Sequence, residues 1–82
     1  MALSEDVVLQ GLKEILEEVA GVSPSDVTGA KDFSNDLDVD SLSMVEVVVA
    51  AEERFGIKIP DDAVTEMKTV ADAVAYIVKA AA

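Results

Sequence analysis

The chain has 82 residues, of which 51% are hydrophobic, so it is predicted to form one small domain with a modest core. Its 17 acidic and 6 basic residues give a net charge of −11, which disfavours nucleic acids and anionic membrane surfaces as partners. The absence of Cys excludes disulfides and thiolate sites, and the absence of His as well argues against zinc or copper.

A first helix is predicted from Ser4, which can cap it, to Gly21, which can end it. Apolar residues recur in this segment at helical spacing, with charged residues on the opposite face. A long connection follows, roughly residues 21 to 39, with a Ser-Pro-Ser-Asp turn signal near its start. Val27 and Phe33 are expected to anchor it to the core. Loops of this length are unusual in compact domains and often carry function.

A second helix is predicted to begin at Asp40 or Ser41, either of which can cap it, and to run to about Phe55. Gly56 is a natural stop for this helix. Residues 57–60 are then expected to form a short connector, although their alternation also resembles a strand.

Two further helices complete the predicted fold. Pro60 at a first helical position opens a short third helix that ends near Met67. Thr69 and Asp72 resemble a capping box for a final helix, whose three terminal alanines are expected to fray. The sequence therefore predicts a single all-α domain over residues 1–82. It is a four-helix bundle with three longer helices, one short third helix and a long first loop.

The second helix has two apolar faces when its residues are placed at ~100° intervals. The face without charge, which is expected to meet the core, contains Met44, Val47, Val48, Ala51 and Phe55. The other face combines three apolar residues with three carboxylates, namely Leu42, Val45, Glu46, Val49, Glu52 and Glu53. An exposed apolar strip with an acidic rim suits transient docking to a protein partner. Alternatively, neighbouring helices or the long loop cover this strip.

Ser41 stands at the start of the second helix, directly after three closely spaced carboxylates. No His is available as its general base, and no G-x-S-x-G motif surrounds it, so a hydrolase is disfavoured. Phosphate groups, in contrast, are favoured at helix N-termini. We therefore interpret Ser41 as the attachment point of a phosphate-linked group, in a protein that is not an enzyme.

Four short runs carry a resemblance to a known family. They are Asp40-Ser41-Leu42, Val45-Glu46-Val47-Val48, Glu52-Glu53-Arg54-Phe55 and Ile57-Lys58-Ile59-Pro60-Asp61. In this context the chain resembles an acyl carrier protein of the discrete (type II) fatty-acid synthase kind, and is similar to actinobacterial members. The resemblance implies a 4′-phosphopantetheine arm on Ser41, transferred from coenzyme A by a phosphopantetheinyl transferase that recognises Asp40. Growing acyl chains would then travel as thioesters on this arm between the enzymes of fatty-acid biosynthesis.

The resemblance also implies where partners and acyl chains bind. Docking residues would be Leu42, Val45, Glu46, Val49, Glu52 and Glu53, with Ile59 and Asp61 at the edge. Residues lining a cavity for the acyl chain would be Met44, Val48, Ala51, Phe55, Ile59 and Met67. The partners are the transferase and acyltransferase, ketosynthase, reductase and dehydratase enzymes with basic patches. We expect a cytoplasmic monomer without a membrane span, a nucleic-acid partner or a specific metal site.

Three alternatives stay open at this point. A discrete polyketide-synthase carrier shares nearly all of these features. An acidic calcium-binding helical protein is suggested by Asp36, Asp38 and Asp40 at positions 1, 3 and 5 of an EF-hand-like run. However, Ser41 replaces the glycine of that loop and Val47 replaces its bidentate glutamate; a core-facing Val47 could not be a ligand. A purely structural helical domain would leave the acid-rimmed strip unexplained.

Overall fold

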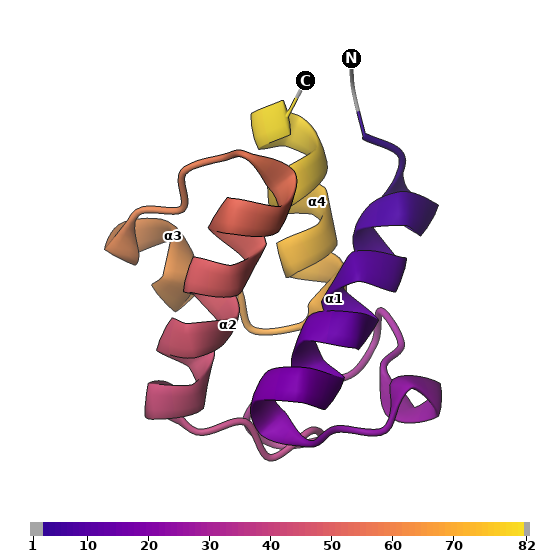
Figure 1. Cartoon of the computed structure of the whole chain (residues 1–82). Helices are drawn as coiled ribbons and strands as arrows, with labels where there is room; N and C mark the ends of the chain where they lie inside the picture. Colours follow the sequence, from indigo (N-terminus) through magenta and orange to yellow (C-terminus); the bar gives the residue numbers. More distant parts are fainter. Residues whose placement is uncertain (1–2, 82) are drawn as a thin grey trace.

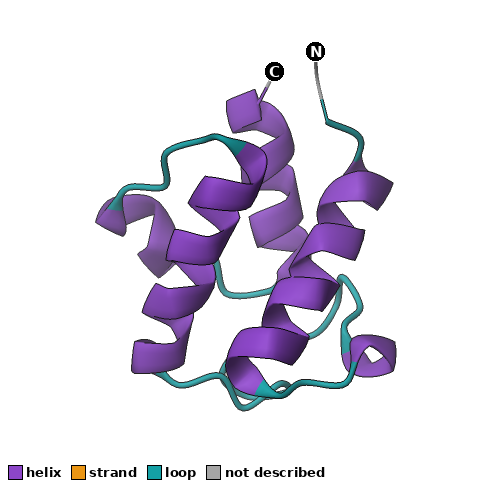
Figure 2. Cartoon of the chain, viewed as in Figure 1, coloured by secondary structure: helices purple, strands orange, loops and turns teal. Residues whose placement is uncertain are grey.

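The computed structural model describes residues 3–81, which form a small helical bundle (Figures 1 and 2). Its elements are α1 (Glu5–Ala20), a 3₁₀ turn η1 (Pro24–Asp26), α2 (Ser41–Phe55), α3 (Asp61–Glu66) and α4 (Val70–Ala81). This architecture confirms the predicted all-α fold, with three longer helices, a short third helix and a long first loop. In the described part of the chain no strand forms, and β-pairing is limited to an isolated bridge between Asp32 and Thr69.

The helices pack around a core to which every α-helix contributes. Helix α1 packs against both α2 and α4. In the view of Figure 1, α3 lies on the opposite side of α2 from α1. None of the helices formed by residues 3–81 is both long and apolar enough to cross a membrane.

Local capping interactions set the helix ends as predicted. The hydroxyl of Ser4 accepts a hydrogen bond from the backbone N–H of Val7 at 3.2 Å and so caps α1. Gly21 and Gly56 end α1 and α2 in the left-handed conformation, with φ of 68° and 65°. Because this region penalises a Cβ atom, glycine is the favoured residue at both positions.

The predicted capping box of α4 is confirmed. The backbone N–H of Thr69 donates to Asp72 Oδ2, and the backbone N–H of Asp72 donates to Thr69 Oγ1, both at 3.2 Å. The predicted fraying is wrong for Ala80 and Ala81, which belong to α4, while Ala82 lies outside the described residues.

The start of α3 differs by one residue from the prediction. Pro60 is the extended residue before the helix, with φ of −69° and ψ of 160°, and α3 begins at Asp61. The carbonyl of Pro60 accepts hydrogen bonds from Ala63 and Val64, at 3.0 and 3.2 Å. The fixed φ of proline suits either position, and the extended ψ decides that Pro60 precedes the helix.

The long first loop is anchored to the rest of the molecule at both its side chains and its backbone. Val27 and Phe33 are buried, which confirms them as anchors. The backbone N–H of Phe33 donates to the carbonyl of Lys68, and that of Val70 donates to the carbonyl of Lys31, each at 3.0 Å. The loop is therefore fixed to the α3–α4 connection before it leads into α2.

Candidate functional site

Ser41 is the first residue of α2, and its side chain is exposed. The preceding residue, Asp40, caps the helix through Oδ1, which accepts a hydrogen bond from the backbone N–H of Ser43 at 2.8 Å. This backbone bond, reinforced by the Ser43 side chain, lowers the pKa of Asp40 below its ordinary value of 3.8. Asp40 is therefore anionic at neutral pH, and it fixes the helix turn that presents the Ser41 hydroxyl.

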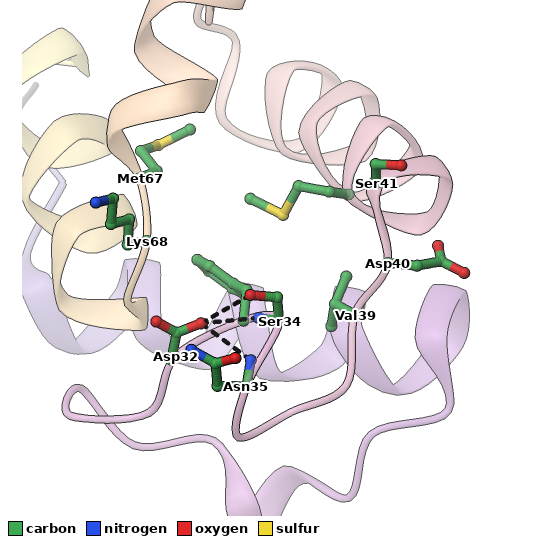
Figure 3. Close-up of a pocket in the computed structure, with 10 residues that line it drawn as sticks. Asp32, Ser34, Asn35, Val39, Asp40, Ser41, Met67 and Lys68 are labelled. Carbon is green, nitrogen blue, oxygen red and sulfur yellow. Dashed lines mark hydrogen bonds between the residues drawn. The ribbon is translucent and has the colours of Figure 1, made fainter.

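An open groove with a volume of about 440 Å³ begins beside Ser41 (Figure 3). It lies between the first loop, the start of α2 and the α3–α4 connection, and is lined by Asp32, Phe33, Ser34, Asn35, Val39, Asp40, Ser41, Met44, Met67 and Lys68. The groove thus combines a polar rim with apolar walls. A flexible, amphipathic group attached to Ser41 would find both kinds of surface within reach.

The loop side of this groove is held by the carboxylate of Asp32. Its Oδ1 accepts hydrogen bonds from the backbone N–H and hydroxyl of Ser34, at 3.0 and 3.1 Å, and from the backbone N–H of Asn35 at 3.1 Å (Figure 3). The Asn35 bond is the largest cause that lowers the pKa of Asp32, followed by the bonds from Ser34 and the charge of Lys68. The rim is therefore preorganised by an ionised side chain.

Behind the groove lies an inner void of about 10 Å³, roughly the space of one water molecule. It is lined by Leu12, Phe33, Met44, Val47, Val48, Ala51, Ile59, Met67, Ala73 and Ile77. Phe33, Met44 and Met67 line both the groove and the void, so these three side chains stand between the surface and the core interior. The void is too small for an alkyl chain unless these side chains move.

Five of the six residues expected to line a cavity do line this void, namely Met44, Val48, Ala51, Ile59 and Met67. Phe55 is not among the lining residues. Its ring lies over Gly11 of α1 instead, where an added Cβ would be 2.6 Å from Phe55 Cζ. The lining residues from other elements, such as Leu12 and Ile77, were missed because the periodicity of one helix does not reveal which side chains face it.

The apolar strip on the outer face of α2 is open. Leu42, Val45 and Val49 are 72%, 57% and 48% exposed, so neither a helix nor the long loop covers them. The carboxylates of Glu46 and Glu53 are exposed on the same helix. The structure therefore rejects the alternative in which this strip belongs to the core.

Two residues expected at the docking surface are less exposed than the others. Ile59 is only 6% exposed, and its side chain lines the inner void. Glu52 is half-buried, and its Oε2 accepts a hydrogen bond from the backbone N–H of Ile59 at 2.7 Å. Asp61, in contrast, is exposed at the start of α3. The Glu52 contact was missed because it crosses the turn at Gly56 and joins α2 to the connection that follows it.

The EF-hand alternative fails at the position that was expected to decide it. Val47 is 2% exposed and lies in the core, so it cannot supply the last ligand of such a loop. Asp40 is engaged as a helix cap, and Asp36 accepts a hydrogen bond from the backbone N–H of Asp32 at 2.7 Å. Within residues 3–81, no group of three or more acidic side chains is arranged to hold a metal ion.

Comparisons with a family model and with known proteins agree on one family. The model of the phosphopantetheine attachment site family matches residues 10–77. An acyl carrier protein from Acidothermus cellulolyticus is 65% identical over 80 residues, which cover 98% of this chain and 95% of the relative. One from Thermobifida fusca is 54% identical over 79 residues, covering 96% and 100%. A meromycolate extension acyl carrier protein from Mycolicibacterium aurum is 53% identical over 79 residues, covering 96% and 81%. With its helical fold and its exposed serine at the start of α2, the chain belongs to the acyl carrier protein family, whose cofactor is phosphopantetheine.

Proposed function

We propose that Ser41 carries the 4′-phosphopantetheine arm, and that the protein shuttles growing acyl chains between the enzymes of a discrete fatty-acid synthase. The observation that carries this proposal is the exposed Ser41 hydroxyl at the first residue of α2, beside an open groove with apolar walls. The names of the relatives, acyl carrier and meromycolate extension acyl carrier proteins, support a fatty-acyl cargo over the polyketide alternative.

The residues around Ser41 fit such a group. A phosphodiester is favoured near a helix N-terminus, and the hydroxyl that would bear it is accessible. When bound, the arm supplies a terminal thiol that holds acyl groups as thioesters, a function that this Cys-free chain lacks by itself. The flexible thioethers of Met44 and Met67 stand between the groove and the inner void. Their movement would admit an alkyl chain to the core.

The outer face of α2 suits short-lived contacts with basic proteins. The exposed strip of Leu42, Val45 and Val49 provides apolar area, while Glu46 and Glu53 provide charge for steering. The expected partners are the phosphopantetheinyl transferase, which would recognise Asp40, and acyltransferase, ketosynthase, reductase and dehydratase enzymes. In this role the protein has no catalytic activity of its own. It would act as a cytoplasmic monomer alongside these enzymes.

The attachment site is tested by intact-mass spectrometry after incubation with coenzyme A and a phosphopantetheinyl transferase. One phosphopantetheine should be added to the unmodified protein and none to the Ser41→Ala variant. Ser43→Ala, which removes a hydroxyl from the same helical turn, is the matched control and should be modified. An adduct that persists in a folded Ser41→Ala variant would refute the assignment.

The docking face is tested by Glu46→Lys, which reverses one exposed charge beside the apolar strip. We expect weaker binding to a basic partner enzyme, a smaller dependence of the Kd on salt, and an unchanged circular dichroism spectrum. Glu18→Lys makes the same charge change at an exposed position of α1 and serves as the control. Equal loss of affinity in both variants would mean that net charge, and not this face, determines binding.

A further inference from the structure

The side chain of Glu52 ties the end of α2 to the α2–α3 connection. Its Oε2 accepts the backbone N–H of Ile59 at 2.7 Å, across seven residues and the left-handed turn at Gly56. The neighbouring Glu53 is exposed, whereas Glu52 is half-buried. Two adjacent carboxylates on one helix therefore have different surroundings.

The segment that Glu52 holds also forms part of the inner void. The Ile59 side chain is buried and lines the void together with residues of α1, α2 and α4. Other hydrogen bonds of this connection are longer: the backbone N–H groups of Gly56 and Ile57 donate to the carbonyl of Glu52 at 2.9 and 3.2 Å, and Tyr76 Oη donates to the carbonyl of Lys58 at 3.5 Å. The Glu52 carboxylate therefore provides the shortest of the hydrogen bonds that fix this wall.

Glu52 also lines an open surface hollow of about 430 Å³. The hollow is lined by Val49, Glu52, Glu53, Gly56, Ile57 and Lys58. Val49 also belongs to the exposed apolar strip on α2, so the hollow adjoins the proposed docking face. A cationic side chain that entered it would lie near two glutamates and one lysine, Lys58, in a protein of net charge −11.

We propose that Glu52 is a latch: an arginine of a docked partner pairs with its carboxylate, releases the Ile59 amide and thereby loosens one wall of the inner void. A guanidinium that bound both carboxylate oxygens from the side of the hollow would turn the carboxylate toward itself, and would so compete with the Ile59 amide for Oε2. Docking and access to the core interior would then be coupled through one side chain. That the void receives an acyl chain rests on the proposed acyl-carrier function, whereas the latch itself is a property of the unmodified chain.

The test measures amide hydrogen exchange at Ile59 by NMR, in the unmodified protein, with and without a tri-arginine amide peptide at low ionic strength. We expect the peptide to accelerate exchange at Ile59 by about tenfold, since the loss of a charge-assisted hydrogen bond has this order of effect. Exchange at Leu12, in the core of α1, should not change, which separates local opening from global unfolding.

Three variants distinguish a latch from a merely structural hydrogen bond. Glu52→Gln keeps an oxygen acceptor but not the charge, so Ile59 should stay protected whether or not the peptide is present. In Glu52→Ala, the amide hydrogen of Ile59 should exchange rapidly without any peptide. Glu53→Gln removes one charge from the same hollow without touching the Ile59 amide, and should retain the peptide-induced acceleration.

The proposal is overturned if the peptide fails to bind the wild-type protein, or if it binds without changing exchange at Ile59. It is also overturned if Glu52→Gln responds as the wild type does, or if Glu52→Ala keeps wild-type protection. If Glu52→Ala does not fold, the comparison of wild type, Glu52→Gln and Glu53→Gln still tests the latch. The carrier proposal fails separately, because the mass experiment at Ser41 is independent of exchange at Ile59.

Discussion

Two residues just before Ser41 have distinct local roles: Asp38 adopts a disfavoured backbone conformation, and Asp40 caps the helix. Asp38 is the one non-glycine residue between positions 3 and 81 with a positive φ, of 59°. Its exposed side chain lies between the buried Leu37 and Val39. The left-handed backbone at Asp38 therefore lets the chain bury both neighbours just before it reaches the capping Asp40. Aspartate and asparagine tolerate this region better than most residues with a Cβ.

The conformation of Asp38 predicts an unequal response to two substitutions that remove the same charge. Asp38→Val should lower the free energy of unfolding by about 1–2 kcal/mol, because a β-branched residue is strongly disfavoured at positive φ. Asp38→Asn should change it by much less. Urea denaturation of both variants measures the difference. Equal stabilities would show that the backbone angle carries no cost, since neither side chain loses packing at this exposed position.

The pKa of Asp40 predicts a stability contribution that depends on pH. Because its folded-state pKa is lowered, the ionised cap stabilises the fold fully above the ordinary value of 3.8, and this contribution is lost as the pH falls through the folded pKa. Asp40→Asn retains a capping oxygen that does not titrate. The stability advantage of wild type over this variant should thus be constant near neutral pH and shrink below pH 3.8. Urea midpoints across this range measure it, and parallel profiles would contradict the assignment.

At the scale of elements, the close approach of α1 and α2 explains two residues that the sequence alone leaves unexplained. Gly11 lies inside α1, where glycine costs about 1 kcal/mol relative to alanine. The end of α2 packs over it, with Phe55 Cζ 2.6 Å and Arg54 Nε 2.9 Å from where a Cβ would lie. Arg54, which interrupts an acidic run, pairs with Glu14 of α1 at 3.2 Å. Both residues thus serve the helix–helix contact.

This contact predicts that Gly11→Val is destabilising, by about 1–3 kcal/mol, because overpacking against the Phe55 ring outweighs the gain in helix propensity. The shorter side chain of Phe55→Leu should reduce that penalty in the double variant. Urea denaturation of the two single variants and the double variant gives their coupling energy. Strict additivity would show that the added side chain does not meet the ring.

At the scale of the whole molecule, uncompensated negative charge is the main electrostatic feature. Within residues 3–81 no charged side chain is buried, and the Arg54–Glu14 pair is the one ion pair within 4.0 Å. Both partners are about half exposed, so the pair contributes little to stability. Mutual repulsion among the carboxylates therefore opposes the compact state.

Self-repulsion predicts that added salt raises the Tm. Sodium chloride at about 0.1 M shortens the Debye length to about 10 Å, and magnesium chloride should act at lower concentration because divalent ions also bind among carboxylates. Thermal unfolding followed by circular dichroism at neutral pH measures the shift, and an uncharged osmolyte at equal osmolality is the control. A Tm independent of both salts would mean that the acids are too far apart to repel appreciably.

The sequence by itself determined the features that depend on near neighbours. Interactions within about one helical turn set the caps at Ser4 and Asp40 and the end of α2 at Gly56. The spacing of apolar residues along α2 likewise predicts its buried and exposed faces. The exposed position of Ser41 at a helix start follows from the same local rules.

Only the tertiary structure decided which of two similar residues makes a given contact. Sequence reasoning placed Glu52 and Glu53 together on one acidic rim, yet only Glu52 holds the Ile59 amide. It placed Phe55 and Ile59 together in one cavity, yet only Ile59 lines the void. These outcomes depend on how elements distant in sequence pack against each other, because a helix's own periodicity fixes the direction of a side chain but not the neighbour that it meets.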